Sequence, residues 1–535
     1  MSSKFIFVVG GVCSSLGKGI AAASMGALLK RSGHSVFLMK VDPYLNVDPG
    51  TMNPEQHGEV FVTDDAAETD LDLGHYERFI NQPLSKYSTV TMGRIYSEVL
   101  ENERKGEYLG KTIQIIPHIT GAIKSKIYKA AEESQADIVI VEIGGTVGDI
   151  EGQPCLEAIR QIQREVGKNQ ALFVMLTLLP YLASSKELKT KPTQLAVREL
   201  QSSGIFPDMM LLRSDYPIQE EHFQKIALFC NVERDAVIPA YTVESIYEVP
   251  LKFAESSLHS ILERKLGLNT STSPNLEEFE QLIEKIKNPD LEPIRIGIVT
   301  KYHNLDDAYL SVHEAIKSAS YMNNRKPVLV PINSEKLEEN DQDEWAKFEM
   351  VDGIIVPGGF GSRGIEGKIQ ACTWAREHQL PYLGLCLGSQ ILSIETARNL
   401  AGMKDANSTE FNAKTPYAIV DIMESQKSVE QKGGTMRKGV YICHLTPGTK
   451  AHEAYGKESI LERHRHRYEF NNAFQDILEQ NGIIFSGRYL DEGIVEIVER
   501  KDHPFMVGVQ FHPEFTSRPC TGHPLFNAFI RAAAK

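Results

Sequence analysis

The chain has 535 residues, a mass of 59.8 kDa and a formal net charge of -14 from 57 basic and 71 acidic residues. This length is enough for about two to four domains, each with its own hydrophobic core. Hydrophobic residues make up 42% and charged residues 24%, which excludes a disordered, collagen-like or disulfide-scaffold protein. The acidic balance also argues against a nucleic-acid-binding protein that relies on bulk electrostatics.

Neither a membrane segment nor a secretory leader is expected. The longest apolar run, residues 171–183, is shorter than the roughly 18–20 residues that a membrane helix needs, and it contains Pro180. Residues 5–9 lead into Gly10 and Gly11 without a cleavage-site pattern, so they are predicted to form the first strand. The seven cysteines include no CxxC pair, which favours a reduced, cytoplasmic protein.

Short apolar segments alternate with longer helical patterns in the first half of the chain. Strands are predicted at residues 5–9, 36–41, 138–141 and 172–176, with a helix that runs through residues 25–31. Continuous apolar runs suit parallel strands that are buried on both faces. The alternation therefore predicts an α/β fold with right-handed crossovers.

The pattern weakens between about residues 266 and 293. Residues 269–275 are polar and turn-rich, and a short amphipathic helix is predicted to follow them. Strand patterns then resume at residues 294–299, 351–356, 382–385 and 505–510. We therefore predict two doubly wound α/β domains, 1–267 and 294–535, joined by a linker at 268–293.

Residues 10–19, Gly-Gly-Val-Cys-Ser-Ser-Leu-Gly-Lys-Gly, lie between a predicted strand and a predicted helix. Glycines let the backbone turn tightly and direct several N–H groups at one phosphate, and Lys18 adds a positive charge. The spacing departs from the standard phosphate loop, because five residues separate Gly11 from Gly17 and Gly19 replaces the Ser or Thr that usually binds magnesium. The sequence therefore predicts a phosphate site whose metal ion has other ligands.

Two acidic segments could supply those ligands. Glu142 ends the strand at 138–141, and a carboxylate at this edge of a parallel sheet is expected beside the phosphate loop. Residues 68–73 are the second segment, for which a solvated acidic loop is the competing interpretation. Residues 189–194 place two lysines around a proline-fixed turn, which could bind a second polyphosphate or be plain surface.

A thiol site is predicted in the second domain. Residues 381–390 predict a strand, a sharp turn and a helix, with Cys386 in a Gly-x-Cys-x-Gly elbow. The helix start favours the thiolate, His512 can take the thiol proton, and Glu514 can orient the imidazole. Backbone N–H groups of residues 356–361 would form an oxyanion hole. A buried structural cysteine is the competing interpretation, and it is disfavoured because three separate parts fit one constellation.

Two further patterns suggest a dinucleotide site and a metal site, and neither suggestion is supported by the surrounding sequence. Residues 359–364 match GxGxxG, but dinucleotide binding requires an acidic residue at the end of the next strand, and that strand ends at Leu385 and Cys386. Residues 463–467, Arg-His-Arg-His-Arg, lack the cysteine or carboxylate pattern of a metal site. We expect an exposed or carboxylate-binding basic turn there instead.

These segments resemble the CTP synthase family over nearly the whole chain. The most specific ones are residues 10–20, 42–52 and 68–79, while residues 384–390 and 512–514 are similar to class I glutamine amidotransferases. The resemblance implies an enzyme of pyrimidine biosynthesis that converts UTP, ATP and glutamine to CTP, ADP, phosphate and glutamate through a 4-phosphorylated UTP intermediate. Free ammonia would replace glutamine. The N-terminal domain would be the phosphate-loop amidoligase, and the C-terminal domain the class I glutamine amidotransferase.

The resemblance also implies site residues, cofactors and partners. The catalytic residues would be Cys386, His512 and Glu514, and Mg2+ would be held by Asp72 and Glu142. ATP would contact Ser15, Leu16, Gly17, Lys18, Gly19, Ile20, Asp72, Arg213 and Val243; UTP or CTP would contact Ser14, Asp149, Ile150, Glu151, Lys189, Thr190, Lys191, Pro192, Thr193, Gln194 and Lys225; glutamine would contact Gly359, Leu387, Gly388, Ser389, Gln390, Glu410 and Arg467. GTP would be an allosteric activator, CTP a feedback inhibitor, and the assembly a homotetramer that could form filaments.

Two alternative functions remain at this point. An amidoligase for another acceptor, such as a cobyrinic-acid-type amidase, combines a similar phosphate loop with a similar thiol domain, but residues 189–194 favour a triphosphate acceptor. A nucleotide-binding assembly protein that has lost catalysis is the second alternative. The presence of Lys18, Cys386, His512 and Glu514 speaks against it.

Overall fold

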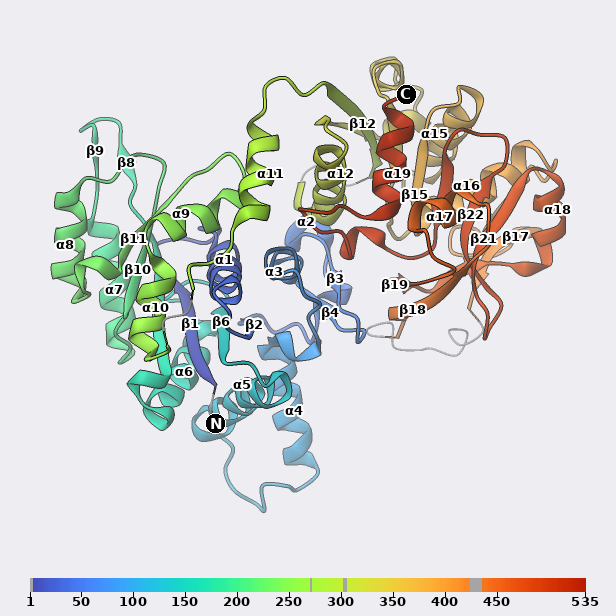
Figure 1. Cartoon of the computed structure of the whole chain (residues 1–535). Coiled ribbons are helices and arrows are strands. Elements are labelled where there is room, and N and C mark those ends of the chain that lie inside the picture. The colour runs from blue at the N-terminus through green and yellow to red at the C-terminus, as the bar shows by residue number, and fades with distance from the viewer. Residues whose placement is uncertain (1–2, 270–271, 302–305, 424–434) are drawn as a thin grey trace. The chain divides into compact units, whose positions relative to one another are not determined.

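The computed structural model describes residues 3–269, 272–301, 306–423 and 435–535, and these residues form two compact units. Unit 1 comprises Met1–Pro49 and Asp72–Ile283, and unit 2 comprises Gly50–Leu71 and Glu284–Lys535. Each unit is built around its own parallel or mixed sheet (Figure 1). No helix among the described residues combines the length and the apolar character that crossing a bilayer requires.

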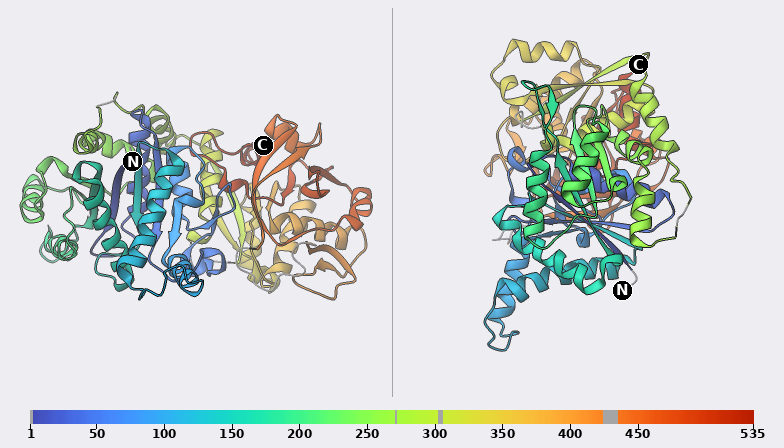
Figure 2. Two further views of the ribbon diagram at one scale, coloured as in Figure 1. Left: turned by 90° about the horizontal axis from the view of Figure 1, so that it is seen from below. Right: turned by 90° about the vertical axis from the view of Figure 1, so that its left-hand side faces the viewer.

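Unit 1 contains a seven-stranded, wholly parallel sheet with helices on both of its faces (Figures 1 and 2). In sheet order the strands are β11 (Val237–Tyr241), β10 (Met209–Ser214), β7 (Ala171–Leu178), β1 (Lys4–Gly10), β6 (Ile138–Ile143), β2 (Val36–Asp42) and β5 (Thr89–Thr91). The helices are α1 (Lys18–Arg31), α3 (Asp72–Ile80), α4 (Met92–Arg104), α5 (Thr120–Ser134), α6 (Gln153–Val166), α7 (Lys191–Ser202), α8 (Glu220–Cys230), α9 (Val249–Glu255) and α10 (Leu258–Leu266). Because β1 and β6 are parallel neighbours, the loop after β1 and Glu142 of β6 share one edge of the sheet.

Unit 2 contains a nine-stranded sheet that is parallel from β13 to β23 and antiparallel from there to β19. In sheet order the strands are β13 (Lys326–Asn333), β12 (Pro293–Thr300), β14 (Gly353–Val356), β15 (Tyr382–Leu385), β23 (Met506–Val509), β22 (Ile494–Arg500), β21 (Ile483–Tyr489), β18 (Arg437–Leu445) and β19 (Ser459–His466). A three-stranded sheet adds β16 (Ala406–Ser408), β17 (Tyr417–Ile422) and β20 (Tyr468–Phe470). The helices include α12 (Leu310–Met322), α13 (Ser334–Glu338), α14 (Gln342–Ala346), α15 (Ile365–Glu377), α16 (Leu387–Asn399), α17 (Lys450–Tyr455), α18 (Gln475–Gln480) and α19 (Pro524–Ala533).

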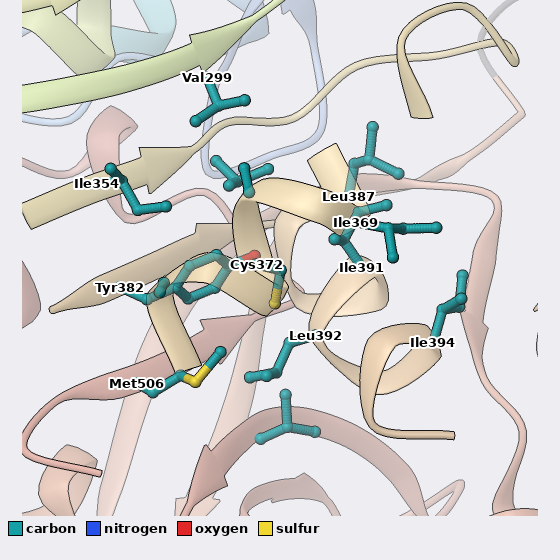
Figure 3. Packing of buried hydrophobic residues seen from close by; sticks show 14 of the residues in the cluster. Val299, Ile354, Ile369, Cys372, Tyr382, Leu387, Ile391, Leu392, Ile394 and Met506 are labelled. Carbon is teal, nitrogen blue, oxygen red and sulfur yellow. The ribbon is translucent and has the colours of Figure 1, made fainter. Parts of the chain in front are cut away.

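The large sheet of unit 2 separates two hydrophobic clusters. Tyr382 belongs to one cluster, while its neighbour Leu383 belongs to the other, because successive side chains of a strand point to opposite faces. The cluster with Tyr382 also contains Cys372 of α15 and Leu387 of α16 (Figure 3). Both helices are therefore anchored on the sheet by buried apolar contacts, and α16 holds the segment that follows Cys386.

The α/β fold and the buried parallel strands that the sequence predicts are confirmed. β15 has the predicted bounds, 382–385, and the other predicted strands differ by a few residues at their ends. Two predicted turns are wrong. Lys191 begins α7, so residues 191–194 are the first helical turn, and residues 463–466 lie within β19.

The two units also divide the chain differently from the expected domains 1–267 and 294–535. Within the expected linker 268–293, of which residues 270 and 271 lie outside the described residues, the structure has α11 (Glu277–Lys287). Phe279 of α11 is buried against Phe79, so the first part of this helix belongs to unit 1. The second difference is Gly50–Leu71, which interrupts unit 1 in sequence but packs with unit 2.

Ion pairs fix residues 50–71 to unit 2. The segment contains α2 (Pro54–His57) and a hairpin of β3 (Phe61–Val62) and β4 (Glu68–Thr69). The buried Glu68 carboxylate accepts from Arg465 Nε at 2.9 Å and from Lys438 Nζ at 2.9 Å, and Asp64 accepts from Arg463 Nε at 2.5 Å. The basic residues of β18 and β19 thus have carboxylate partners, as one of the two expectations for residues 463–467 requires.

Replacing Glu68 by Gln tests this anchor. The variant leaves Arg465 and Lys438, both largely buried, without their counter-charge, so the free energy of unfolding of unit 2 should fall by about 3 kcal/mol. Calorimetry would measure the loss. As a control, Glu278→Gln removes the ion pair of Arg31 with a carboxylate that is 59% exposed, and it should cost less than about 1 kcal/mol. Equally small losses in both variants would contradict the anchor.

The ion pairs of Glu68 also predict how the stability of unit 2 depends on pH. Burial alone would raise the pKa of Glu68, but the charges of Arg465 and Lys438 outweigh burial and hold that pKa below its ordinary value. A depressed carboxyl pKa stabilises the folded state fully above the unfolded value of about 4.3, and the gain is lost as the pH falls through the folded pKa. The difference in the free energy of unfolding between wild type and Glu68→Gln should therefore be constant between about pH 6 and about pH 8, and it should shrink only at acidic pH.

Candidate functional sites

Cys386 lies at the junction between β15 and α16. Its φ of 49° is in the left-handed region, which is strained for a residue with a side chain. The turn is so tight that a Cβ at Gly384 would lie 2.5 Å from the carbonyl carbon of Gly388, and a Cβ at Gly388 would lie 2.1 Å from the carbonyl oxygen of Val356. Both flanking glycines are therefore required, and the structure has the elbow that the Gly-x-Cys-x-Gly pattern predicts.

His512 and Glu514 lie beside this elbow. His512 Nδ1 and Glu514 Oε1 are 2.7 Å apart, so the carboxylate orients the ring. A Cβ at Gly358 would lie 3.1 Å from His512 Cε1 and 3.6 Å from Cys386 Cβ, which shows how closely the three residues approach. Burial alone would lower the pKa of His512, but Glu514 and Cys386 outweigh it and raise that pKa to about 10. The imidazole therefore carries a proton at neutral pH.

Two buried lysines hold the loop of residues 357–361 from behind. Lys368 Nζ donates to the carbonyl oxygen of residue 357 at 3.2 Å. Lys301 Nζ donates to the carbonyl oxygens of residues 360 and 361, the latter at 3.1 Å. Burial lowers the pKa of Lys368 to about 7 and that of Lys301 to about 8. These contacts fix the course of the loop beside Cys386, which the sequence pattern did not indicate.

The residues that the resemblance assigns to glutamine gather around the elbow. Leu387, Gly388, Ser389 and Gln390 form the first turn of α16. Gly361 N donates to Glu410 Oε1 at 2.9 Å. Burial raises the pKa of Glu410, although Gly361, Lys301 and Arg467 oppose the rise. The structure thus brings this set together within unit 2.

A cavity of about 350 Å³ in unit 2 contains Cys386, His512 and Glu514. Its remaining wall includes Gly50, Thr51, Met52, Pro54, Glu59 and Val60. Glu59 is buried and accepts from the Ser311 backbone N–H at 2.8 Å. Residues 50–60, far from Cys386 in the sequence, therefore form part of the wall of the thiol cavity, and no local sequence signal indicated this.

The phosphate loop of unit 1 explains the unusual Gly19. A Cβ at Gly19 would lie 2.2 Å from Asp72 Oδ1 and 3.4 Å from Glu142 Oε2. The two carboxylates occupy the space that a Ser or Thr side chain would fill. The structure thus brings Gly19 and both predicted metal ligands together, and it shows why a hydroxyl residue is excluded.

The two carboxylates lie in a buried charged cluster. Lys40 Nζ donates to Asp72, and the Tyr76 hydroxyl donates to Glu142. Burial would raise the pKa of Asp72, but Lys40 outweighs it and lowers that pKa. Burial and the Asp72 charge raise the pKa of Glu142, which lies in a strand that is fully buried. Lys40 and Tyr76 are site residues that the sequence analysis missed, because neither belongs to the loop.

Most of the predicted ATP residues line one cavity. Its volume is about 230 Å³, and its lining includes Ser15, Leu16, Gly17, Ile20, Arg213 and Val243 together with Tyr241 and Phe253. Lys18 lies at the loop, where its Nζ donates to the carbonyl oxygen of Gly145 at 2.7 Å. The structure therefore brings residues from separate segments of the sequence around one cavity.

The residues assigned to UTP or CTP are less closely gathered. The side chain of Asp149 accepts from Thr146 N at 2.7 Å, and Ile150 is largely exposed. Lys189 pairs with Glu187, and the adjoining residues 190–194 cap and begin α7. Lys225 is exposed on α8, and Ser14 is exposed in the phosphate loop. Within this set, Gln194 Nε2 donates to Thr190 Oγ1 at 3.2 Å, so these two residues of the first turn of α7 are joined to each other.

Comparisons with known proteins agree with this geometry. The family model described as CTP synthase N-terminus matches residues 4–268, and the model described as glutamine amidotransferase class-I matches residues 304–532. CTP synthase of Carboxydothermus hydrogenoformans is 56% identical over 533 residues, covering 100% of this chain and 99% of the relative. CTP synthase of Caldanaerobacter subterraneus subsp. tengcongensis is 54% identical over 530 residues, covering 99% and 98%.

Among the solved structures similar to this chain is one that covers 45% of it. It is the glutaminase domain of Trypanosoma brucei CTPS with bound acivicin, with 36% sequence identity, a TM-score of 0.42, and coverage of 45% of this chain and 94% of that chain. The two family models together span both units, and the relatives match along nearly the full length of both chains. The chain therefore belongs to the CTP synthase family, whose members carry a class I glutamine amidotransferase domain after the synthase domain.

Proposed function

We propose that this enzyme makes CTP by two reactions at separate sites, with Cys386 of unit 2 releasing ammonia from glutamine and the phosphate loop of unit 1 holding ATP for the amination of UTP. The conversion of UTP to CTP with ATP and glutamine is the family activity. The assignment of the two steps to particular residues is our inference. The observation that carries it is the presence, in one chain, of a thiol elbow and a phosphate loop flanked by two carboxylates.

In the first reaction, Cys386 Sγ attacks the side-chain carbonyl carbon of glutamine. The protonated His512, held by Glu514, gives its proton to the departing nitrogen, so that the C–N bond breaks and ammonia leaves. Water then hydrolyses the thioester to glutamate. Backbone N–H groups of the loop at 358–359 would stabilise the negative oxygen, and the buried lysines at 301 and 368 keep that loop in place.

Unit 1 would bind ATP in the cavity lined by Arg213 and Val243, with the phosphates on residues 15–20. Asp72 and Glu142 would hold Mg2+, a cation that prefers one or two carboxylates and completes its shell with phosphate oxygens and water. The cradle around Gly19 fits this ion, because both carboxylates approach the start of α1 where a side chain is absent. When bound, the ion would neutralise charge on the transferring phosphoryl group.

In the second reaction, the uracil O4 would accept the γ-phosphoryl group and become a good leaving group. Ammonia would then attack C4, phosphate would leave, and the amine would lose its surplus protons. Water must be kept from the phosphorylated intermediate, and ammonia must arrive unprotonated, so an enclosed delivery route is expected. The triphosphate of UTP would lie on residues 14, 149–151, 189–194 and 225, where the positive end of the α7 dipole favours an anion.

Further properties of this enzyme are inferred from the family alone. They are activation by GTP, feedback inhibition by CTP, a homotetramer, a cytoplasmic location and the use of free ammonia. The cobyrinic-acid-type alternative is disfavoured by full-length identity above 50% to CTP synthases. The catalytically inactive alternative is disfavoured by the ordered pair of His512 and Glu514 beside Cys386.

Cys386→Ala separates the two reactions. We expect CTP formation from glutamine to be lost and CTP formation from ammonium chloride to stay within about twofold of wild type, because only the thiol reaction needs this sulfur. The increase in absorbance that accompanies the conversion of UTP to CTP measures both. Cys372→Ala, which removes another buried thiol of unit 2, serves as the matched control and should retain both activities. Equal loss with both nitrogen donors would refute the division of labour.

Glu142→Gln tests the metal site. The change keeps the size of the side chain and removes its charge, so the magnesium concentration for half-maximal ammonia-dependent activity should rise by at least about tenfold. Asp72→Asn should behave alike, and the double variant should lose less than the sum of both, since one ion is served. Alkylation of Cys386 should not change. An unshifted magnesium midpoint with a normal rate would remove Glu142 from the metal site.

A further inference from the structure

Gln510 occupies a position that the proposed chemistry has not used. It directly follows β23 and precedes the catalytic His512 by two residues. Its side chain is 3% exposed, so each of its polar atoms needs a partner within the protein. Nε2 of Gln510 lies 3.4 Å from Cys386 Sγ, which makes this amide a direct neighbour of the reacting atom.

The hydrogen-bond partners fix which way the amide points. The carbonyl oxygen of Tyr468 can only accept, so the atom of Gln390 that lies 3.1 Å from it must be the amino group, Nε2. That amino group also lies 3.2 Å from Gln510 Oε1, which must then be the acceptor. The amino group of Gln510 consequently faces the sulfur. The order Tyr468, Gln390, Gln510, Cys386 is a chain of donors and acceptors with one consistent direction.

The backbone keeps this chain in register. Gln510 N donates to the carbonyl oxygen of Glu496 at 2.8 Å, and Cys386 N donates to the carbonyl oxygen of Val509 at 2.7 Å. Gln510 thus follows the end of β23 in the chain, and the backbone of Cys386 is hydrogen-bonded to the same end of that strand. Cys386 is also buried, so close packing around it limits the movement of its sulfur away from the amide.

This N–H group affects the balance between the thiol and the thiolate form of Cys386. A donor aimed at sulfur stabilises the thiolate more than the thiol, and hydrogen bonds to charged groups are the stronger ones. The thiol form has a weak alternative acceptor in the carbonyl oxygen of Arg465, 3.9 Å from Sγ, which the thiolate cannot use. Since Gln510 and Cys386 are both buried, water competes little for either group.

We propose that Gln510 positions the nucleophile: its amide N–H holds the sulfur of Cys386 at the elbow and stabilises the thiolate. His512 accepts the thiol proton and passes it to the leaving nitrogen. This inference rests on the proposed function of Cys386. It assigns two different tasks to two residues of β23 and its extension. Gln510 interacts with the charge on sulfur, and His512 interacts with the proton that sulfur gives up and the leaving nitrogen receives.

Gln510→Leu and Gln510→Glu test the proposal together. Leucine removes the amide, and glutamate keeps its size but presents an acceptor instead of a donor. The rate of Cys386 alkylation by iodoacetamide, followed by peptide mass spectrometry from pH 5 to pH 9 in steps of about half a unit, reports the thiolate. We expect the midpoint to move up by about one unit in Gln510→Leu and further in Gln510→Glu. The kcat for glutamine should fall about tenfold with KM within about twofold, and ammonia-dependent CTP formation should not change.

Ser393→Ala is the matched control. Ser393 is buried on α16 and donates to the Ser389 carbonyl oxygen at 3.2 Å, so its removal deletes a buried hydrogen bond near the elbow without touching sulfur. Its alkylation profile should match wild type. A purely structural role of Gln510 would lower the melting temperature in both Gln510 variants and leave the alkylation midpoint in place, which would overturn the proposal.

The outcomes also separate this proposal from the function on which it rests. If alkylated wild-type enzyme still makes CTP from glutamine, Cys386 is not the nucleophile and the proposed function fails. If alkylation abolishes that activity but both Gln510 variants keep the wild-type midpoint, only the role of Gln510 fails. Should Gln510→Leu not fold, shown by loss of the cooperative melting transition of unit 2, the isosteric Gln510→Glu decides by the same midpoint.

Discussion

The steric constraint at Cys386 determines the chemistry of unit 2. A strand must stop, turn with a positive φ and start a helix within one residue, and the turn has no room for a Cβ at Gly384 or Gly388. The buried clusters on both faces of the sheet hold β15 and α16 in this arrangement, so packing energy maintains the strain at the elbow. The parallel neighbour β23 then delivers His512 to the same edge.

In unit 1, the glycine that matters makes room for carboxylates and not for a tight turn. Gly19 leaves space in which Asp72 and Glu142 approach the start of α1, and Lys40 offsets part of their charge. In unit 2, Lys301 and Lys368 instead hold the loop beside the thiol, and a protonated His512, paired with Glu514, lies next to Cys386. The two environments suit opposite tasks. One gathers negative charge for a cation, and the other stabilises negative charge that develops on sulfur and oxygen.

Local patterns could be predicted from the sequence, and long-range pairings could not. The strand at 382–385, the elbow at Cys386 and the pair of His512 with Glu514 depend on neighbouring residues, so their spacing was sufficient. The packing of residues 50–71 with the rest of unit 2 was missed, because Glu68 and its partner Arg465 are 397 residues apart in the sequence. The turn expected at 463–467 was wrong for the same reason, since those partners let basic residues lie in a strand. Lys368 gave no signal, because burial of a lysine is visible only in the fold.

The central claim is that the strained elbow makes Cys386 the nucleophile that carries the glutamyl group. The most direct measurement is acid quenching of the enzyme during turnover of glutamine labelled with carbon-14 in its backbone, followed by digestion and identification of the labelled peptide. The account predicts that label is bound through a base-labile thioester to the peptide that contains Cys386 and is absent in Cys386→Ala. Label on the peptide of another of the seven cysteines, or covalent label that persists in Cys386→Ala, would contradict it.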